Sequence, residues 1–127
     1  MASQNNSGRQ YNKVHALTIV TAAAVLAHRF IAYDGDYATS AGGVHDAQGV
    51  SEFDAKAGTA LSIVTSYSYL VEAEKNIAFG DFVKPGMDGR AVIGTATECC
   101  GRALGDAIAG NVVEVQLLAH RHAVVKP

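Results

Sequence analysis

Short runs in which apolar and polar side chains alternate, separated by glycines and polar turns, make up most of the chain. Such alternation is typical of strands that bury one face. We expect strands in six runs: Val14 to Val20, Arg29 to Tyr33, Thr59 to Val71, Asp81 to Lys84, Arg90 to Ile93 and Asn111 to Leu118. The run that begins at Thr59 is long for one strand, so it predicts either two strands or one bent strand. This spacing favours a mainly-β barrel or sandwich.

Helix signals are weak along the whole chain. Only Thr21 to His28 and Thr97 to Leu104 have a pattern from which a helical turn or two would form. Residues 1–13 are polar, with Tyr11 as their one large apolar side chain, so we expect a flexible N-terminal arm. The sequence therefore predicts an arm over 1–13, a β domain over 14–118 and a C-terminal tail over 119–127.

The sequence also contains an internal repeat. With an offset of 52 positions, the segment Gly49 to Gly58 aligns without a gap on Gly101 to Gly110. Identical residues at this offset include three further pairs: Phe30 and Phe82, Asp36 and Asp88, Gly42 and Gly94. We therefore expect two pseudo-equivalent units over about residues 28–66 and 80–118.

Each predicted unit contains an Asp-Ala-x-Ala-Gly turn. Gly58 and Gly110 would supply the positive φ that lets the chain reverse, and Asp54 and Asp106 would accept hydrogen bonds from turn amides. These four residues are predicted to be structural.

Composition narrows the class of partner. The 127 residues have 10 Lys and Arg against 12 Asp and Glu, a net charge of −2, so no broad basic field is present and a nucleic-acid partner is not expected. Hydrophobic residues make up 49%, which excludes a disordered chain, and the absence of Trp predicts a core of small side chains. Because only 17% of residues are charged, a partner is expected to cover part of the surface.

One stretch has the outline of a targeting signal. Arg9 and Lys13 precede the uncharged segment Ala16 to Ala27, an order that also occurs in signal peptides. That segment is too short to span a bilayer, and the strand-like alternation begins before it. A first strand that runs into a small-residue turn is the better interpretation, and no membrane partner is expected.

Residues that bind metals do not gather in a recognised motif. Asp34-Gly35-Asp36 lacks the downstream ligands of a calcium loop and is predicted to be a turn. His120 and His122 would share one face of a strand, as a metal-binding pair requires, but no third ligand stands at a recognised spacing, which favours a solvated tail. Cys99 and Cys100 are expected to pack as small hydrophobic residues. No metal site is predicted.

Catalytic motifs are missing as well. The sequence has no Gly-x-Ser-x-Gly, and Gly86 to Arg90 has neither a P-loop lysine nor dinucleotide-binding spacing. Glu72 and Glu74 would share a strand face, as charges that protect a sheet edge also do. We therefore expect neither an enzyme nor a cofactor, but an interaction module.

The order of these segments resembles the small capsid cement, or decoration, proteins of tailed bacteriophages. The resemblance covers about residues 14–118 and is carried by the segments Arg29 to Gly35, Gly49 to Val64, Ala78 to Lys84 and Gly101 to Leu118. Phe79 departs from the family pattern, which has alanine there.

The resemblance implies a small β-barrel or β-tulip-like fold and a virion structural protein without catalytic residues. It implies a homotrimer on the outer capsid surface, at threefold and quasi-threefold positions, that clamps major capsid subunits and stabilises the shell against internal genome pressure. Because a polar arm can order on docking by adding a strand to a sheet edge, the predicted capsid-binding residues are those of the arm: Arg9, Gln10, Tyr11, Asn12 and Lys13. Tyr11 would be the apolar anchor.

Two alternatives stand beside this hypothesis. The arm can be a plain disordered terminus. The protein can also be a non-viral β-sandwich that binds carbohydrate or another surface, although Trp is absent and the aromatic platform of such a site would have to come from four tyrosines: Tyr33, Tyr37, Tyr67 and Tyr69.

Overall fold

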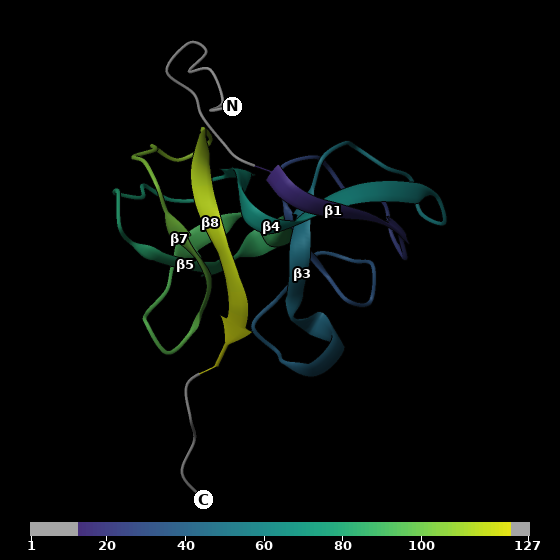
Figure 1. Cartoon of the computed structure of the whole chain (residues 1–127), viewed down its shortest axis with the longest axis horizontal. Helices are drawn as coiled ribbons and strands as arrows, with labels where there is room; N and C mark the ends of the chain where they lie inside the picture. The colour runs from purple at the N-terminus through teal and green to yellow at the C-terminus, as the bar shows by residue number, and fades with distance from the viewer. Residues whose placement is uncertain (1–12, 123–127) are drawn as a thin grey trace, which may run out of the picture.

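Eight strands and two 3₁₀ turns organise residues 13–122, the part of the chain that the computed structural model describes (Figure 1). The strands are β1 (Lys13–Val20), β2 (Phe30–Ala32), β3 (Ala47–Ser51), β4 (Ala60–Glu72), β5 (Phe82–Pro85), β6 (Ala91–Ile93), β7 (Cys99–Ala103) and β8 (Val112–Arg121). The turns are η1 (Gly43–His45) and η2 (Met87–Gly89). The predicted mainly-β single domain is confirmed. Within residues 13–122, no helix has the length and apolar character needed to cross a bilayer.

The strands form one barrel-shaped, nearly closed sheet with the order β2-β3-β4-β8-β7-β5-β6, and β1 pairs with β4 beside this path. β4 belongs to both halves of the sheet. Its first half pairs with β1 and β3, and its second half pairs with β8. The long run from Thr59 is thus one strand, and Tyr67 with φ 61° stands between its two halves.

Strand registers repeat at an offset of 52 residues. Val20 pairs with Ala60, and Glu72 pairs with Val112. The same offset relates the β2–β3 ladder to the β5–β7 ladder, and the β3–β4 ladder to the β7–β8 ladder. Unit one therefore consists of β1, β2, β3 and the first half of β4, and unit two of the second half of β4, β5, β7 and β8. Each unit includes a first strand that the ranges 28–66 and 80–118 leave out.

β3 and β7 are strands that the alternation pattern did not predict, and Thr97 to Leu104, one of the two segments with a weak helix signal, contains β7. Both strands contain a glycine at the same place in the repeat, Gly49 and Gly101. A Cβ on Gly49 would lie 2.4 Å from the Val64 carbonyl oxygen, and one on Gly101 would lie 2.4 Å from Val115 Cγ1. Each strand lies so close to its neighbour that only glycine fits at this position. Because glycine has no side chain and is uncommon in strands, it weakens the strand signal in the sequence.

Small side chains fill the core, as the composition predicts. The main cluster lies between the two units and includes Phe30, Val50, Val64, Val71, Val83, Cys100 and Val115. A smaller cluster in unit one contains Val25, Ile31, Leu61 and Ile63. Cys99 and Cys100 are free thiols with exposed fractions of 0% and 2%, which agrees with their expected packing as small hydrophobic residues.

Candidate functional site

Most of the predicted capsid-binding arm lies outside the described residues. Arg9, Gln10, Tyr11 and Asn12 fall before residue 13, and Lys13 is the first residue of β1, where its backbone pairs with Tyr67. The assignment of these residues to capsid binding stays a prediction.

The two Asp-Ala-x-Ala-Gly turns have the same geometry. Gly58 and Gly110 have φ of 76° and 91°. Asp54 Oδ1 accepts the Ala27 N–H at 2.8 Å, and Asp106 Oδ1 accepts the equivalent N–H, that of Phe79, at 2.7 Å. The Gly58 and Gly110 amides each donate at 2.8 Å to carbonyls that are again 52 residues apart. Each turn thereby joins the segment after the unit's first strand to the segment before its last.

An apolar hollow lies beside each Asp-Ala-x-Ala-Gly turn, and exposed hydrophobic side chains lie near it. The hollow in unit one has about 320 Å³ and is lined by Ala24 to Leu26 and Asp54 to Lys56. Its counterpart in unit two has about 550 Å³ and includes Ile77 and Ile108 in its lining. Exposed large apolar side chains that gather in one place are typical of contact surfaces. We call the residues with such side chains near these turns the turn patches: Leu26 and Phe53 in unit one, Phe79 and Ile108 in unit two.

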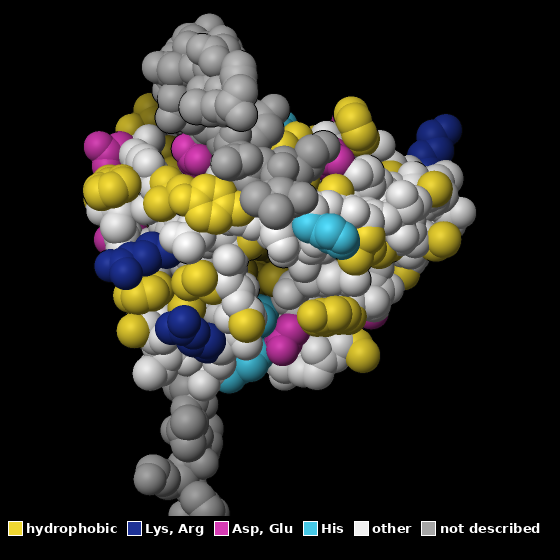
Figure 2. Space-filling model, in the orientation of Figure 1, with side chains coloured by type: hydrophobic (Ala, Val, Ile, Leu, Met, Phe, Trp, Pro, Cys, Tyr) yellow, Lys and Arg dark blue, Asp and Glu magenta, His cyan; other side chains and the backbone are white. Residues whose placement is uncertain are grey.

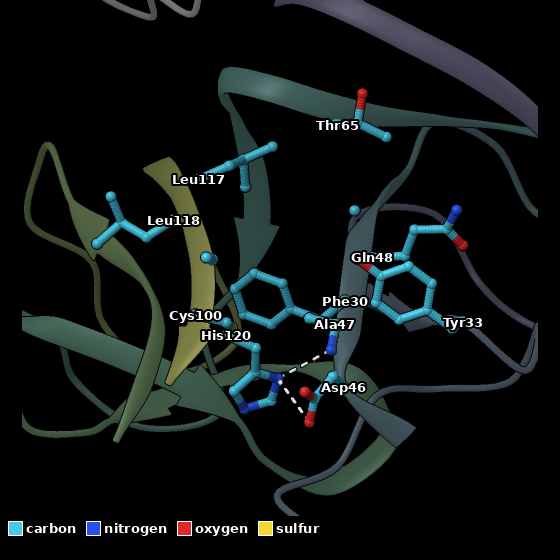
Figure 3. Close-up of a pocket in the computed structure, with 12 residues that line it drawn as sticks. Phe30, Tyr33, Asp46, Ala47, Gln48, Thr65, Cys100, Leu117, Leu118 and His120 are labelled. Carbon is cyan, nitrogen blue, oxygen red and sulfur yellow. Dashed lines mark hydrogen bonds and ion pairs between the residues drawn. The ribbon is translucent and has the colours of Figure 1, made fainter. Parts of the chain in front are cut away.

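A third hollow lies between β3 and β8. β3 and β8 run side by side there (Figure 1), but among the described residues no backbone ladder joins them. The hollow between them has about 330 Å³. Figure 3 shows Phe30, Tyr33 and Gln48 on one side of it, and Leu117, Leu118 and His120 of β8 on the other. We call this region the seam.

His120 of β8 and His122, directly after β8, join the two sides of the seam. The Ala47 N–H of β3 donates to His120 Nδ1 at 2.8 Å (Figure 3). His122 Nε2 lies 2.6 Å from Asp46 Oδ1, and the same oxygen lies 3.7 Å from His120 Nδ1. Hydrogen bonds of side chains therefore connect β3 to β8 here, whereas backbone hydrogen bonds connect neighbouring strands elsewhere in the sheet.

The predicted solvated tail is wrong for His120. β8 continues to Arg121, three residues beyond the predicted end at Leu118. The side chain of His120 has an exposed fraction of only 2%, against 34% for His122. The buried imidazole of His120 accepts the hydrogen bond of the Ala47 amide at the edge of β3.

Burial controls the ionisation of two groups at the seam. Desolvation lowers the pKa of His120, and the charge of Asp46 opposes this only in part. The amide that donates to Nδ1 also favours the neutral ring. Desolvation raises the pKa of the Cys100 thiol well above its usual value, and Cys99 and Asp46 add to the increase. Cys100 is therefore a neutral packing group and not a nucleophile.

Sequence spacing gave no indication of Asp46. It stands 76 positions before His122, outside any local metal or catalytic motif. The sequence signal for this site was the pair His120 and His122 on one strand face, and only the contact of β3 with β8 supplies the carboxylate.

Comparison with known proteins finds a likeness among solved structures. No family model matches the sequence, and neither does any curated protein. Among solved structures, the N base of the head fiber gp8.5 of bacteriophage phi29 has a similar fold, with a TM-score of 0.68 and 23% identical residues. The match covers 84% of this chain and 96% of that one. The chain therefore shares the fold of a phage head fiber base over nearly the whole of that structure.

Proposed function

We propose that the protein is a structural component of a phage virion, attached to the outer surface of the capsid. The observation that carries this proposal is the likeness in fold to the phi29 head fiber base, which covers 84% of this chain. The cement-like order of segments in the sequence points independently to the same class of protein.

The proposed partner is the major capsid protein. The turn patches and the arm residues Arg9 to Lys13 would form the contacts. Phe79 and Ile108, with exposed fractions of 69% and 63%, supply apolar area whose burial favours association. The arm adds polar contacts that form only on docking.

The finer proposal is that the protein acts as a trimeric cement. A ligand that binds only the assembled lattice stabilises it by mass action, by about 2.7 kcal/mol per site at a free concentration a hundredfold above Kd. Three clamps on one trimer would strengthen attachment, because later contacts form at a high effective concentration.

Co-sedimentation with shells tests attachment directly. The full chain is mixed with shells assembled from the major capsid protein of the same genome, and bound protein is measured. We expect saturable binding, which substitution of Tyr11 by Ala and the double substitution Phe79→Ser/Ile108→Ser should each weaken at least tenfold. Ile93→Ser is the matched control, because Ile93 is an exposed aliphatic residue of β6 outside the turn patches. Absence of binding by the wild-type chain would refute capsid attachment.

The cement role needs two further measurements. Light scattering of the free protein gives its oligomeric state, for which we expect a trimer. The temperature at which filled shells release their genome should rise when the protein saturates them. An unchanged release temperature at full occupancy would leave attachment standing and exclude stabilisation.

A further inference from the structure

The seam brings together three side chains that offer metal ligands. Asp46 stands directly before β3, His120 lies on β8, and His122 follows directly after the end of β8. One ligand atom from each lies within 4.8 Å of those of the other two. Histidine side chains lie next to an acidic one between the ends of β8 and β3 on the face seen in Figure 2.

The distances between the ligand atoms are close to those that a shared ion requires. Asp46 Oδ1 is 2.6 Å from His122 Nε2 and 3.7 Å from His120 Nδ1. Two ligand atoms on a tetrahedral zinc ion are about 3.3 Å apart, because each lies about 2.0–2.1 Å from the metal. The two observed distances bracket this value, so each would change by less than about 1 Å. The imidazole rings are stacked at 4.6 Å, which keeps their nitrogens on one side of β8.

We propose that Asp46, His120 and His122 bind a divalent transition-metal ion, zinc being the best match, that clips β3 to β8 across the seam. Two imidazoles and one carboxylate are a donor set that zinc, cobalt and nickel accept, whereas magnesium and calcium prefer all-oxygen sites. The exposed side of His122 leaves a further coordination position open to water.

Binding requires two small rearrangements. The proton that joins His122 Nε2 to Asp46 Oδ1 must leave Nε2, because zinc binds the unprotonated nitrogen: a neutral ring carries it on Nδ1 instead, and a charged ring releases it to solvent. His120 Nδ1 turns from the Ala47 N–H to the metal, and the released amide needs a new acceptor. The Asp46 carboxylate directly precedes that amide in sequence, and Asp36 Oδ1 in this chain already accepts the next residue's N–H at 2.7 Å.

The ring of His120 is free to make this turn. Its Nε2 is buried and has no hydrogen-bond partner among residues 13–122, so no bond to these residues on the far side of the ring resists the tilt. A histidine kept only for structure is expected to have both nitrogens satisfied when buried. In His120, Nδ1 accepts the Ala47 N–H of β3, and Nε2 has no hydrogen-bond partner among the described residues.

The repeat predicts one ion per chain. The positions equivalent to His120 and His122 at the 52-residue offset hold Ser68 and Leu70, and the position equivalent to Asp46 holds Glu98. Unit two therefore has no second set of ligands at the corresponding place.

Isothermal titration of the full chain with zinc chloride, after removal of any histidine tag, tests the site. We expect one zinc per chain, and at least a hundredfold weaker binding for His122→Ala and for Asp46→Asn. His45→Ala is the matched control, because His45 Nδ1 forms a comparable pair with Asp34 at 3.1 Å and has no second histidine in that pair. This control should bind zinc with unchanged affinity.

A second measurement protects the test against misfolded variants. Cobalt added to the wild-type chain should give the visible absorption of a nitrogen- and oxygen-liganded ion, and zinc should raise the unfolding temperature until a chelator removes it. Failure of the wild-type chain to bind zinc or cobalt would overturn the proposal. So would equal binding by a folded His122→Ala variant. Neither result depends on capsid attachment.

Discussion

In unit one a histidine, His28, has the left-handed backbone conformation with φ 61°, and in unit two a glycine, Gly80, has it with φ 91°. Both residues donate their N–H at 2.9 Å to carbonyls 52 positions apart, those of Ser51 and Ala103. His28 adds two contacts that glycine cannot make: its Nδ1 lies 3.0 Å from the Leu70 carbonyl, and its ring stacks on that of Tyr69. The repeat thus conserves backbone hydrogen bonds and leaves the side chains free to differ.

The seam shows the limit of that repetition. The ladders that the two units share occur twice, but β3 approaches β8 at one place only, and side chains join them there. Features required by the backbone are therefore expected to behave alike in the two units, and features carried by side chains are expected to differ.

The largest expected effect comes from filling the close approaches in β3 and β7. Gly49→Ala should destabilise the fold by about 2–3 kcal/mol, because the new Cβ would meet a backbone carbonyl that cannot move aside. Gly101→Ala should cost somewhat less, because its closest contact, at 2.4 Å, is a methyl group of Val115, and the nearest backbone atom, the Gln116 carbonyl oxygen, is farther away at 2.9 Å. Guanidinium unfolding followed by circular dichroism measures both. Gly105→Ala is the control, since no atom lies within 4 Å of its Cβ position.

The turn aspartates test whether the two units are energetically alike. Asp54→Ala and Asp106→Ala should each cost about 1 kcal/mol through loss of one hydrogen bond to a backbone amide. The double variant should lose the sum, because the two carboxylates share no partner. Asn at either position keeps the accepting oxygen and should retain most of the stability. A clear departure from additivity in denaturant unfolding would contradict the independence of the turns.

The turn glycines give a similar comparison with a different cause. Gly58→Ala and Gly110→Ala should each cost about 1 kcal/mol, because a Cβ is strained at these positive φ values although no atom crowds it. The cost at Gly110 should be the larger, since φ 91° lies further from the left-handed region that other residues tolerate. Equal stability of wild type and both variants in thermal unfolding would show that backbone strain does not limit these turns.

The smallest expected effect is that of His28→Gly. The change removes left-handed strain of about 1 kcal/mol and also removes the Leu70 hydrogen bond and the Tyr69 stacking contact. The net change in unfolding free energy should stay within about 0.5 kcal/mol. A loss well above 1 kcal/mol would mean that the side-chain contacts of His28 outweigh the strain.

Alternation along the chain was enough to predict β1, β4 and β8, because a strand with one wet face shows its period in the residues themselves. The 52-residue identity likewise located the two turns, since an aspartate and a glycine at fixed spacing serve the same local geometry wherever they occur. Both signals are local, and both can be seen without knowing which strands pair.

Tertiary structure alone decided the rest. β3 and β7 contain glycine for a reason that lies on the neighbouring strand, so their own sequence does not show it. The seam joins Asp46 to His122 across 76 positions, because β4 pairs with β1 and β3 through its first half and with β8 through its second, which brings β3 next to β8. The burial of His120 follows from this arrangement around β4. No pattern within residues 119–127 could have indicated it.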